Sequence, residues 1–282
     1  NLGFHAGRSR PGAHVTDQVR VEVDGPLGRL VLDRPEKGHA WLAGMWTAAA
    51  RLLEELAGRS DVAVILLDSS GDRVFSGGAD LVELASIAGT EAGASDILHR
   101  IEGVMAAIEA VPQPVVAVVS GTAIGAGLEI AAAADLRVAA DTARFGIPAA
   151  RIGVVTTRTD VARIVRVAGP ALAFDLLLTG RILDAHEALA SGIVSFVRPA
   201  EQLREAARDL ALRMAASSPV SLREMKRHLL AVSPAAAWDP DAYRSSVDAL
   251  ASADFRARSA ALTFRRGRHD RDEQPAASEE DS

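Results

Sequence analysis

The sequence contains no cysteine, and only 4% of its residues are aromatic. Without cysteine there is no disulfide, no thiol nucleophile and no cysteine metal site, and this absence fits a reducing compartment such as the cytoplasm. Because aromatic side chains are few while 49% of the residues are hydrophobic, the core must consist mainly of Ala, Val, Ile and Leu. Such a core suits helices packed closely against buried strands, so we expect an α/β fold and a cytoplasmic protein.

Other absences narrow the class of partner. No apolar stretch approaches the length that spans a bilayer, and the first residues, "NLGFHAGRSRPGAHVTDQ", are charged and broken by Gly and Pro, unlike a signal peptide. The net charge of −6 provides no basic field for nucleic acid, and the histidines show no metal-ligand spacing. We therefore expect no membrane, nucleic-acid or metal partner, although a few arginines or helix N-termini could still bind an anionic ligand.

The sequence does contain alternating strand and helix patterns. Apolar and polar residues alternate on both sides of Asp24-Gly25, which predicts a β-hairpin. Predicted helices and strands then alternate up to a short strand at 135–139, which favours a parallel sheet. After Thr159 the pattern is almost entirely helical, with "IVSFV" (193–197) as a strand.

These patterns divide the chain into four parts. Residues 19–198 form the predicted core and residues 199–266 a helical C-terminal region. We expect residues 1–18 to be disordered or derived from cloning. Residues 267–282 are charged and almost free of apolar side chains, which predicts a disordered tail.

One carboxylate, Glu129, stands inside the apolar run "VVAVVSGTAIGAGLEIAAAA" (115–134). Its burial would be costly unless it is paired or lies against a cleft. The glycines before it superficially match the nucleotide-binding turn of short-chain dehydrogenases. That interpretation fails because the turn lies too far along the chain and Tyr243 is followed, four residues later, by Val247 rather than lysine. We therefore interpret Glu129 as a candidate functional residue of a cleft.

A second Gly-rich turn lies in "RVFSGGADLVEL" (73–84), where Asp80 can cap the helix that follows. Both turns follow a predicted strand and open a predicted helix, so each presents free backbone N–H groups. Two such N–H groups that converge on one point can form an oxyanion hole.

The two turns together resemble the crotonase, or enoyl-CoA hydratase/isomerase, superfamily. The matching segments, which span roughly residues 19–264, are "RPEKGHA" (34–40), "FSGGADL" (75–81), "AIGAGLEIAAAAD" (123–135), "FGIPAARIGV" (145–154) and "LLLTGRILDAHEALASGIVSFV" (176–197). The resemblance implies a crotonase-like spiral of β-β-α turns and a helical C-terminal region that assembles homotrimers or dimers of trimers.

The resemblance also implies an acyl-CoA thioester substrate, with coenzyme A as part of that substrate and no permanently bound cofactor. The thioester oxygen would lie between the N–H groups of Ala79 and Ala126, and Glu129 would act as acid and base. The residues that would meet coenzyme A are Lys37, Gly38, Ala40, Gly77, Asp80 and Leu81. Lys37 would offset phosphate charge, and the alternative is that it is a flexible surface lysine.

The sequence departs from the family at the second catalytic glutamate, where it has Ala149. Removing a positioned acid or base costs on the order of 10²- to 10⁴-fold, so hydration requires a substitute. Asp160 is the candidate by charge, and the alternative for it is the N-cap of the next helix. Arg158 is either a solvated charge or a partner of Glu129 or of an acidic acyl group. The predicted lining of the acyl pocket is Gly125, Ala149, Thr156, Thr157 and Arg158.

The leading hypothesis is therefore an acyl-CoA enzyme of the enoyl-CoA hydratase/isomerase type. A decarboxylase is an alternative, because expelling CO₂ depends more on the oxyanion hole than on a base. A catalytically inactive acyl-CoA binding protein is another, because of Ala149.

Overall fold

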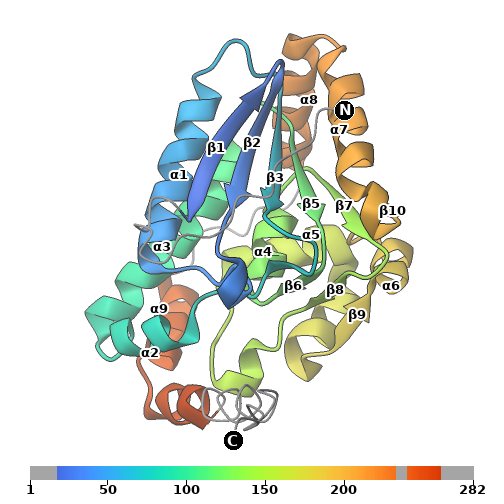
Figure 1. Cartoon of the computed structure of the whole chain (residues 1–282). Helices are drawn as coiled ribbons and strands as arrows, with labels where there is room; N and C mark the ends of the chain where they lie inside the picture. The colour runs from blue at the N-terminus through green and yellow to red at the C-terminus, as the bar shows by residue number, and fades with distance from the viewer. Residues whose placement is uncertain (1–17, 233–239, 262–282) are drawn as a thin grey trace, which may run out of the picture.

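The computed structural model describes residues 18–232 and 240–261 of the chain. Its larger sheet has six strands in the order β1-β2-β3-β5-β7-β10 (Figure 1). Strands β1 and β2 are antiparallel, and the other neighbouring pairs are parallel. The strands are β1 (Val19–Asp24), β2 (Leu27–Leu32), β3 (Val64–Ser69), β5 (Val115–Val119), β7 (Leu136–Ala140) and β10 (Phe196–Arg198).

The predicted hairpin is confirmed. Val19 pairs with Leu32 and Asp24 with Leu27, and Gly25 in the turn has a φ of 56°. A positive φ is easily reached by glycine, which explains the Asp-Gly signal. All residues of β3 and β5 are buried because helices cover both faces of the sheet, so β5 and the first four residues of β3 read as continuous apolar runs.

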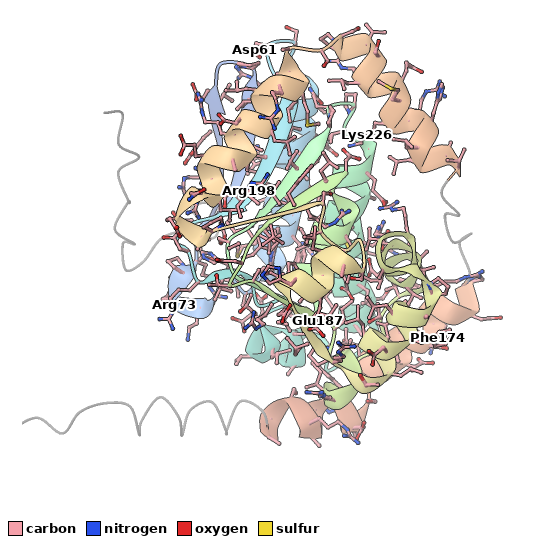
Figure 2. The ribbon with its side chains drawn as sticks, turned by 90° about the vertical axis from the view of Figure 1, so that its right-hand side faces the viewer. Asp61, Arg73, Phe174, Glu187, Arg198 and Lys226 are labelled. Atoms are coloured by element: carbon pink, nitrogen blue, oxygen red, sulfur yellow. The ribbon has the colours of Figure 1, made fainter. Side chains whose placement is uncertain are left out.

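The two faces of the larger sheet are covered by different helices (Figure 1). Helices α1 (Ala43–Ala57) and α3 (Glu91–Ala110) pack on one face, within the main hydrophobic core. Helix α7 (Leu203–Ala215) covers the other face, and Figure 2 views the molecule from its side. It buries Leu203, Ala207 and Ala211, which recur every four residues and so share one side of a helix.

A smaller sheet continues from the larger one and positions the candidate site. Strands β3, β5 and β7 are each followed by a short strand of the smaller sheet, and the next helices are α2, α4 and α5. This repetition of two strands and a helix agrees with the predicted α/β class and confirms it. The smaller sheet, in the order β4-β6-β8-β9, contains β4 (Val74–Ser76), β6 (Thr122–Ile124), β8 (Arg144–Gly146) and β9 (Ile182–Asp184).

The C-terminal part is helical, as predicted. Residues 253–261 are also in a helix. The predicted disordered ends lie outside the described residues, except for Gln18. None of the described helices combines the length and the hydropathy needed to cross a membrane. The remaining helices are α2 (Leu81–Ile87), α4 (Ala126–Ala133), α5 (Arg158–Phe174), α6 (Ala185–Ala190), α8 (Pro219–Val232) and α9 (Pro240–Leu250).

Helix α8 is anchored by a buried lysine, Lys226, which Figure 2 labels. Its Nζ atom lies 2.9 Å from a carboxylate oxygen of Asp135. The same atom donates hydrogen bonds to the carbonyls of Ile108 and Gln113, at 3.2 and 3.1 Å. Desolvation lowers the pKa of Lys226, and the charge of Asp135 opposes that effect. Every donor of this buried ammonium group therefore has an acceptor.

Candidate active site

The two Gly-rich turns lie side by side because the strands before them are paired. Strands β4 and β6 are parallel neighbours, with Val74 opposite Thr122 and Ser76 opposite Ala123. Each strand ends in its turn, and each turn opens a helix, α2 or α4. Parallel strands end at the same edge of a sheet, so the first N–H groups of the two helices lie at one edge.

Glycines allow the turns to touch. Gly78 has a φ of 86°, and a Cβ atom there would lie 2.8 Å from the carbonyl oxygen of Ile124 and 3.2 Å from the nitrogen of Ala126. A Cβ atom on Gly127 would lie only 2.3 Å from the carbonyl oxygen of Ser76. Any larger residue would force the turns apart. The two glycine-rich turns, which are separate in the sequence, therefore contact each other in the fold.

The N–H groups of Ala79 and Ala126 are free in this arrangement. Trp41 pairs with Ala79 as in a parallel sheet: its N–H donates to the Gly78 carbonyl and its carbonyl accepts from the Asp80 N–H. The N–H of Ala79 itself therefore points away from Trp41. Among the described residues, neither this N–H nor that of Ala126 has an acceptor. Two free donors on touching turns can bind one oxygen atom.

Asp80 caps α2, as predicted. Its Oδ1 accepts hydrogen bonds from the N–H groups of Val82 and Glu83, at 3.1 and 3.2 Å. Its Oδ2 lies 2.8 Å from Nη1 of Arg34, a partner that the sequence pattern did not indicate. Burial alone would raise the pKa of Asp80, but Arg34 and the two N–H donors outweigh burial and hold it below its usual value. Asp80 is therefore an ionised, fully engaged carboxylate.

The segment predicted to meet coenzyme A borders the first turn. The N–H of Gly77 donates to the carbonyl of Gly38 at 2.9 Å, and Nη1 of Arg34 donates to the carbonyl of Ala40 at 2.8 Å. Lys37 is exposed and forms no ion pair with any residue that the structure describes. The structure therefore brings Gly38, Ala40 and Gly77 together and leaves the Lys37 ammonium group at the surface beside them.

His39 holds this segment in place. The residue is buried with a φ of 51°, a conformation that histidine tolerates better than most residues. Its Nδ1 accepts from the N–H of Arg34 at 3.0 Å, so Nε2 carries the proton and donates to the carbonyl of Ser70 at 2.8 Å. Desolvation lowers its pKa, which favours this neutral form. His39 is thus a structural residue of the loop.

Glu129 lies in the first turn of α4, three residues after Ala126, and only 7% of its surface is exposed. Its pKa is raised well above the ordinary value, mainly by desolvation and next by the charge of Asp160. The Thr156 hydroxyl and Arg163 lower it, but not enough. No described residue forms an ion pair with Glu129, so the pairing with Arg158 that the sequence left open does not occur. A buried carboxylate that has no ion pair and a raised pKa can hold a proton and release it to a substrate.

Asp160 is part of a buried charge cluster. It is not the N-cap of α5: that position belongs to Thr157, whose Oγ1 accepts from the Asp160 N–H at 3.2 Å. Nη1 of Arg163 lies 2.7 Å from Asp160 Oδ1, and the Thr157 hydroxyl donates to Oδ2 at 2.8 Å. Arg163 also pairs with Glu102 and Glu109, at 2.7 and 3.0 Å.

Burial raises the pKa of Asp160 to about 6. Arg163 opposes this shift, and the charge of Glu102 adds to it. Neither Glu102 nor Glu109 was predicted from the sequence as a site residue. Their seven-residue spacing on α3 places them on one side of that helix, which is the only local signal that could have paired them.

Thr156 differs from its neighbour Thr157. Its Oγ1 is buried and makes no hydrogen bond of ordinary length with a described residue, but its hydroxyl lies close enough to the Glu129 carboxylate to lower the pKa of that residue as a weak hydrogen-bond donor. An unmade hydrogen bond of a buried hydroxyl costs about 1–3 kcal/mol. Arg158, the first residue of α5, is exposed, and Ala149 is partly buried against the core.

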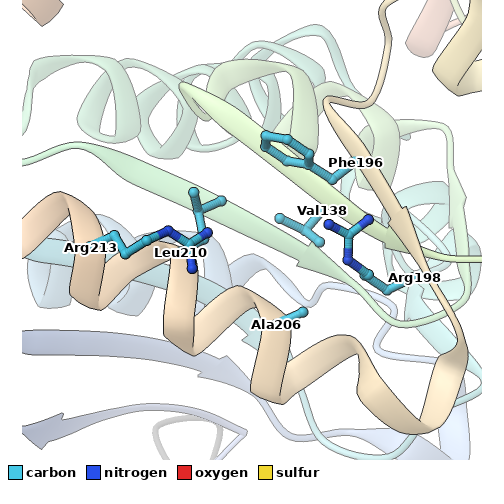
Figure 3. A pocket seen from close by; sticks show the side chains of 6 residues that line it. All are labelled: Val138, Phe196, Arg198, Ala206, Leu210 and Arg213. Carbon is cyan, nitrogen blue, oxygen red and sulfur yellow. The ribbon is translucent and has the colours of Figure 1, made fainter.

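A shallow pocket elsewhere on the molecule is separate from these turns (Figure 3). It lies between β7, β10 and α7, on the face of the sheet that α7 covers, and Arg198 and Arg213 line it over an apolar floor that includes Val138 and Leu210.

The described residues hold no group of three His, Asp or Glu side chains that could bind a metal ion.

Comparison with known proteins agrees with this geometry. The sequence profile of the enoyl-CoA hydratase/isomerase family matches residues 24–240. A probable enoyl-CoA hydratase of Mycobacterium leprae is 36% identical over 210 residues, which cover 74% of this chain and 80% of the relative.

Two solved structures have the same fold. An enoyl-CoA hydratase of Mycobacterium avium subsp. paratuberculosis superimposes with a TM-score of 0.78 at 26% identity, covering 86% of this chain and 98% of the other. A monofunctional enoyl-CoA isomerase of M. smegmatis superimposes with a TM-score of 0.66 at 28% identity, covering 80% and 97%. With its paired Gly-rich turns and its strand and helix order, the chain belongs to the enoyl-CoA hydratase/isomerase, or crotonase, family.

Proposed function

We propose that the protein transforms acyl-CoA thioesters through an enolate. The carrying observation is the pair of free N–H groups on Ala79 and Ala126, on touching turns, with the Glu129 carboxylate, which has no ion pair among the described residues, one helical turn further on. The two N–H groups bind the thioester oxygen and stabilise the negative charge that develops there. Glu129 takes a proton from the substrate or from water and returns it to carbon. Ala126 supplies its donor from the backbone, so its methyl group does not interfere with that role.

In this proposal the first Gly-rich turn (73–84) and the segment 34–40 bind coenzyme A. Lys37 offsets phosphate charge from the surface, and the backbone around it follows the pantetheine arm. The contacts of this part of the substrate come from Lys37, Gly38, Ala40, Gly77, Asp80 and Leu81, and those of the acyl group from Gly125, Ala149, Thr156, Thr157 and Arg158.

Asp160 acts through Glu129 in this proposal. Both of its oxygens are engaged, by Arg163 and Thr157, so it is poorly placed to exchange a proton with a substrate. Its charge nevertheless raises the pKa of Glu129. A raised pKa makes Glu129 a stronger base once it is ionised and lets it hold a proton over a wider pH range than an ordinary glutamate.

The homotrimer, or dimer of trimers, is part of the same proposal, as is the division into a core (19–198) and a C-terminal region (199–266). Helix α8 supports an association, because Val220, Met225, Leu229 and Val232 are each more than half exposed. Light scattering tests it: a trimer or hexamer has three or six times the chain mass of 29.5 kDa, and a monomer contradicts the proposal.

The activity is tested with a panel of saturated, enoyl-, β-hydroxyacyl- and malonyl-type CoA thioesters in D₂O, followed by mass spectrometry. Deuterium incorporation at the α-carbon, or interconversion of enoyl- and β-hydroxyacyl-CoA, supports enolate chemistry. Loss of CO₂ from the malonyl-type substrate as the only reaction identifies a decarboxylase instead. Thermal stabilisation by acyl-CoA without exchange or product identifies a binding protein and contradicts the proposal.

A further inference from the structure

The starting point is the difference between two adjacent hydroxyl groups. Thr157 Oγ1 accepts from the Asp160 N–H and donates to the Asp160 carboxylate, so it is fully used by the fold. Thr156 Oγ1 is also inaccessible to solvent, yet among the described residues it makes no hydrogen bond of ordinary length and has only a weak one to the Glu129 carboxylate. Buried hydroxyl groups are nearly always hydrogen-bonded, so one that is only weakly bonded beside a candidate catalytic residue requires an explanation.

The surroundings of Thr156 point to a ligand rather than to a folding defect. Four other buried side-chain atoms in the described part of the chain lack a partner, and they belong to Gln18, Trp46, Ser70 and Gln113. Of these five residues, only Thr156 takes part in the electrostatics of Glu129. Its hydroxyl can donate one hydrogen bond and accept two, so it can bind a water molecule or an alcohol that also contacts the Glu129 carboxylate.

The site lacks another group for that task. At the position of the second family glutamate the chain has Ala149, whose methyl group binds no water. Asp160 has both oxygens occupied. Within the described residues, the Thr156 hydroxyl is therefore the polar group beside Glu129 that remains available.

We propose that Thr156 is a catalytic residue that binds the oxygen on the β-carbon of the acyl group, together with Glu129. This inference rests on the enolate chemistry proposed above. The oxygen belongs to the water that adds to an enoyl-CoA, or to the hydroxyl of a β-hydroxyacyl-CoA in the reverse direction. Thr156 thereby makes water addition possible in a site with a single free carboxylate.

The step balances without any further reactant. The water oxygen forms a bond to the β-carbon while Glu129 takes one water proton, and the electrons of the double bond move to the thioester oxygen held by Ala79 and Ala126. Glu129 then gives its proton to the α-carbon as the thioester carbonyl reforms. Thr156 neither gains nor loses a proton, because it only orients the oxygen.

The test compares two reactions of the same protein. Exchange of the α-protons of butyryl-CoA in D₂O involves no β-oxygen, whereas hydration of crotonyl-CoA does. Thr156→Val removes the hydroxyl and keeps the shape of the side chain, and Thr156→Ser keeps the hydroxyl. We expect the ratio of hydration to exchange to fall about tenfold in T156V and to stay within about twofold of wild type in T156S.

Ser70→Ala is the matched control, because it removes another buried hydroxyl without a partner, one outside the proposed site. This variant should leave the ratio unchanged. An equal fall of hydration and exchange in T156V would show that Thr156 has only a structural role. Exchange by the wild type without any hydration would overturn the inference about Thr156 alone, whereas a wild type that catalyses neither reaction would overturn the proposed function as well.

Discussion

Two carboxylates of this protein are almost equally buried, but their surroundings differ completely. Asp68, on β3, is 2% exposed and is paired with Arg29 and Arg204 at 2.6 and 3.1 Å. It also accepts a hydrogen bond from the Ser69 N–H at 2.8 Å. Glu129, on α4, is 7% exposed and has no ion pair with any residue that the structure describes. One carboxylate is saturated with donors, and the other is not.

The difference distinguishes a carboxylate that holds the fold together from one that is a candidate for proton transfer. Asp68 connects β2, β3 and α7 through its two arginines, and a buried ion with excellent geometry holds such elements in register. A buried carboxylate without an ion pair adds no such link between elements of the fold. Burial together with the lack of an ion pair therefore marks Glu129 as a candidate for proton transfer, which burial alone does not.

The largest expected effect is that of Glu129→Gln on activity. Because the amide cannot take a proton, α-proton exchange of an acyl-CoA should fall about 10²- to 10⁴-fold. Stability at pH 8 should stay the same or rise, since the raised pKa means that folding disfavours the ionised form of Glu129. Exchange by mass spectrometry and thermal unfolding measure both effects. Full exchange activity in this variant would contradict the role of Glu129.

Asp68→Asn should give the opposite result. Its two arginines would lose their common anion, and we expect the free energy of unfolding to fall by about 3 kcal/mol, at the lower end for a broken buried pair because Arg204 is partly exposed. Exchange activity per folded molecule should not change. Denaturant unfolding measures the loss, and Asp61→Asn, which affects only an exposed pair with Arg59, is the control. A stable but inactive D68N protein would refute the distinction.

The features that could be predicted from the sequence are those that depend on residues close together along the chain. The hairpin at Asp24-Gly25, the Asp80 cap of α2 and the isolation of Glu129 in an apolar run are all local patterns. Their physical causes, turn conformation, orphan N–H groups and desolvation, act over a few residues, so a single stretch of sequence carries the signal.

The partners of buried charges could not be predicted in the same way. Asp80 pairs with Arg34, 46 residues earlier, and Arg163 pairs with Glu102, 61 residues earlier. Such contacts depend on how helices pack, and many charged residues compete for each role. The alternative interpretation of Asp160 as the N-cap of α5 was wrong for a related reason: Thr157, three residues earlier, takes that position.

Asp160→Asn tests how the cluster affects Glu129. The charge of Asp160 contributes to the raised pKa of Glu129, so its removal should move the acid limb of the rate profile to lower pH. The measurement is α-proton exchange as a function of pH, with Asp61→Asn as the control. An unchanged limb would mean that the Asp160 charge does not reach Glu129.

Asp160→Asn should also change how the free energy of unfolding depends on pH. The pKa of Asp160 in the folded protein is about 6, above its ordinary 3.8, so the unfolded chain loses this proton first as the pH rises. Wild-type stability should therefore fall between about pH 4 and pH 6, and D160N should lack this part of the fall. Unfolding curves across this range measure the difference. Parallel curves for the two proteins would contradict the burial of an ionisable Asp160.

The smallest expected effect concerns the lysines, which also differ in whether their charge is paired. The chain has two lysines: Lys226 is buried with all its donors used, and Lys37 is exposed with no ion pair among the described residues. If Lys37 offsets a phosphate of coenzyme A, Lys37→Ala should raise KM about 2- to 5-fold, leave kcat unchanged and lose its effect at high salt, because an exposed ion pair is weak and screened. Arg213→Ala, in the separate pocket beside α7, removes an exposed cation elsewhere and should leave KM unchanged. Equal effects of the two variants would show that only the overall charge matters, and Lys37 would then be an ordinary surface lysine.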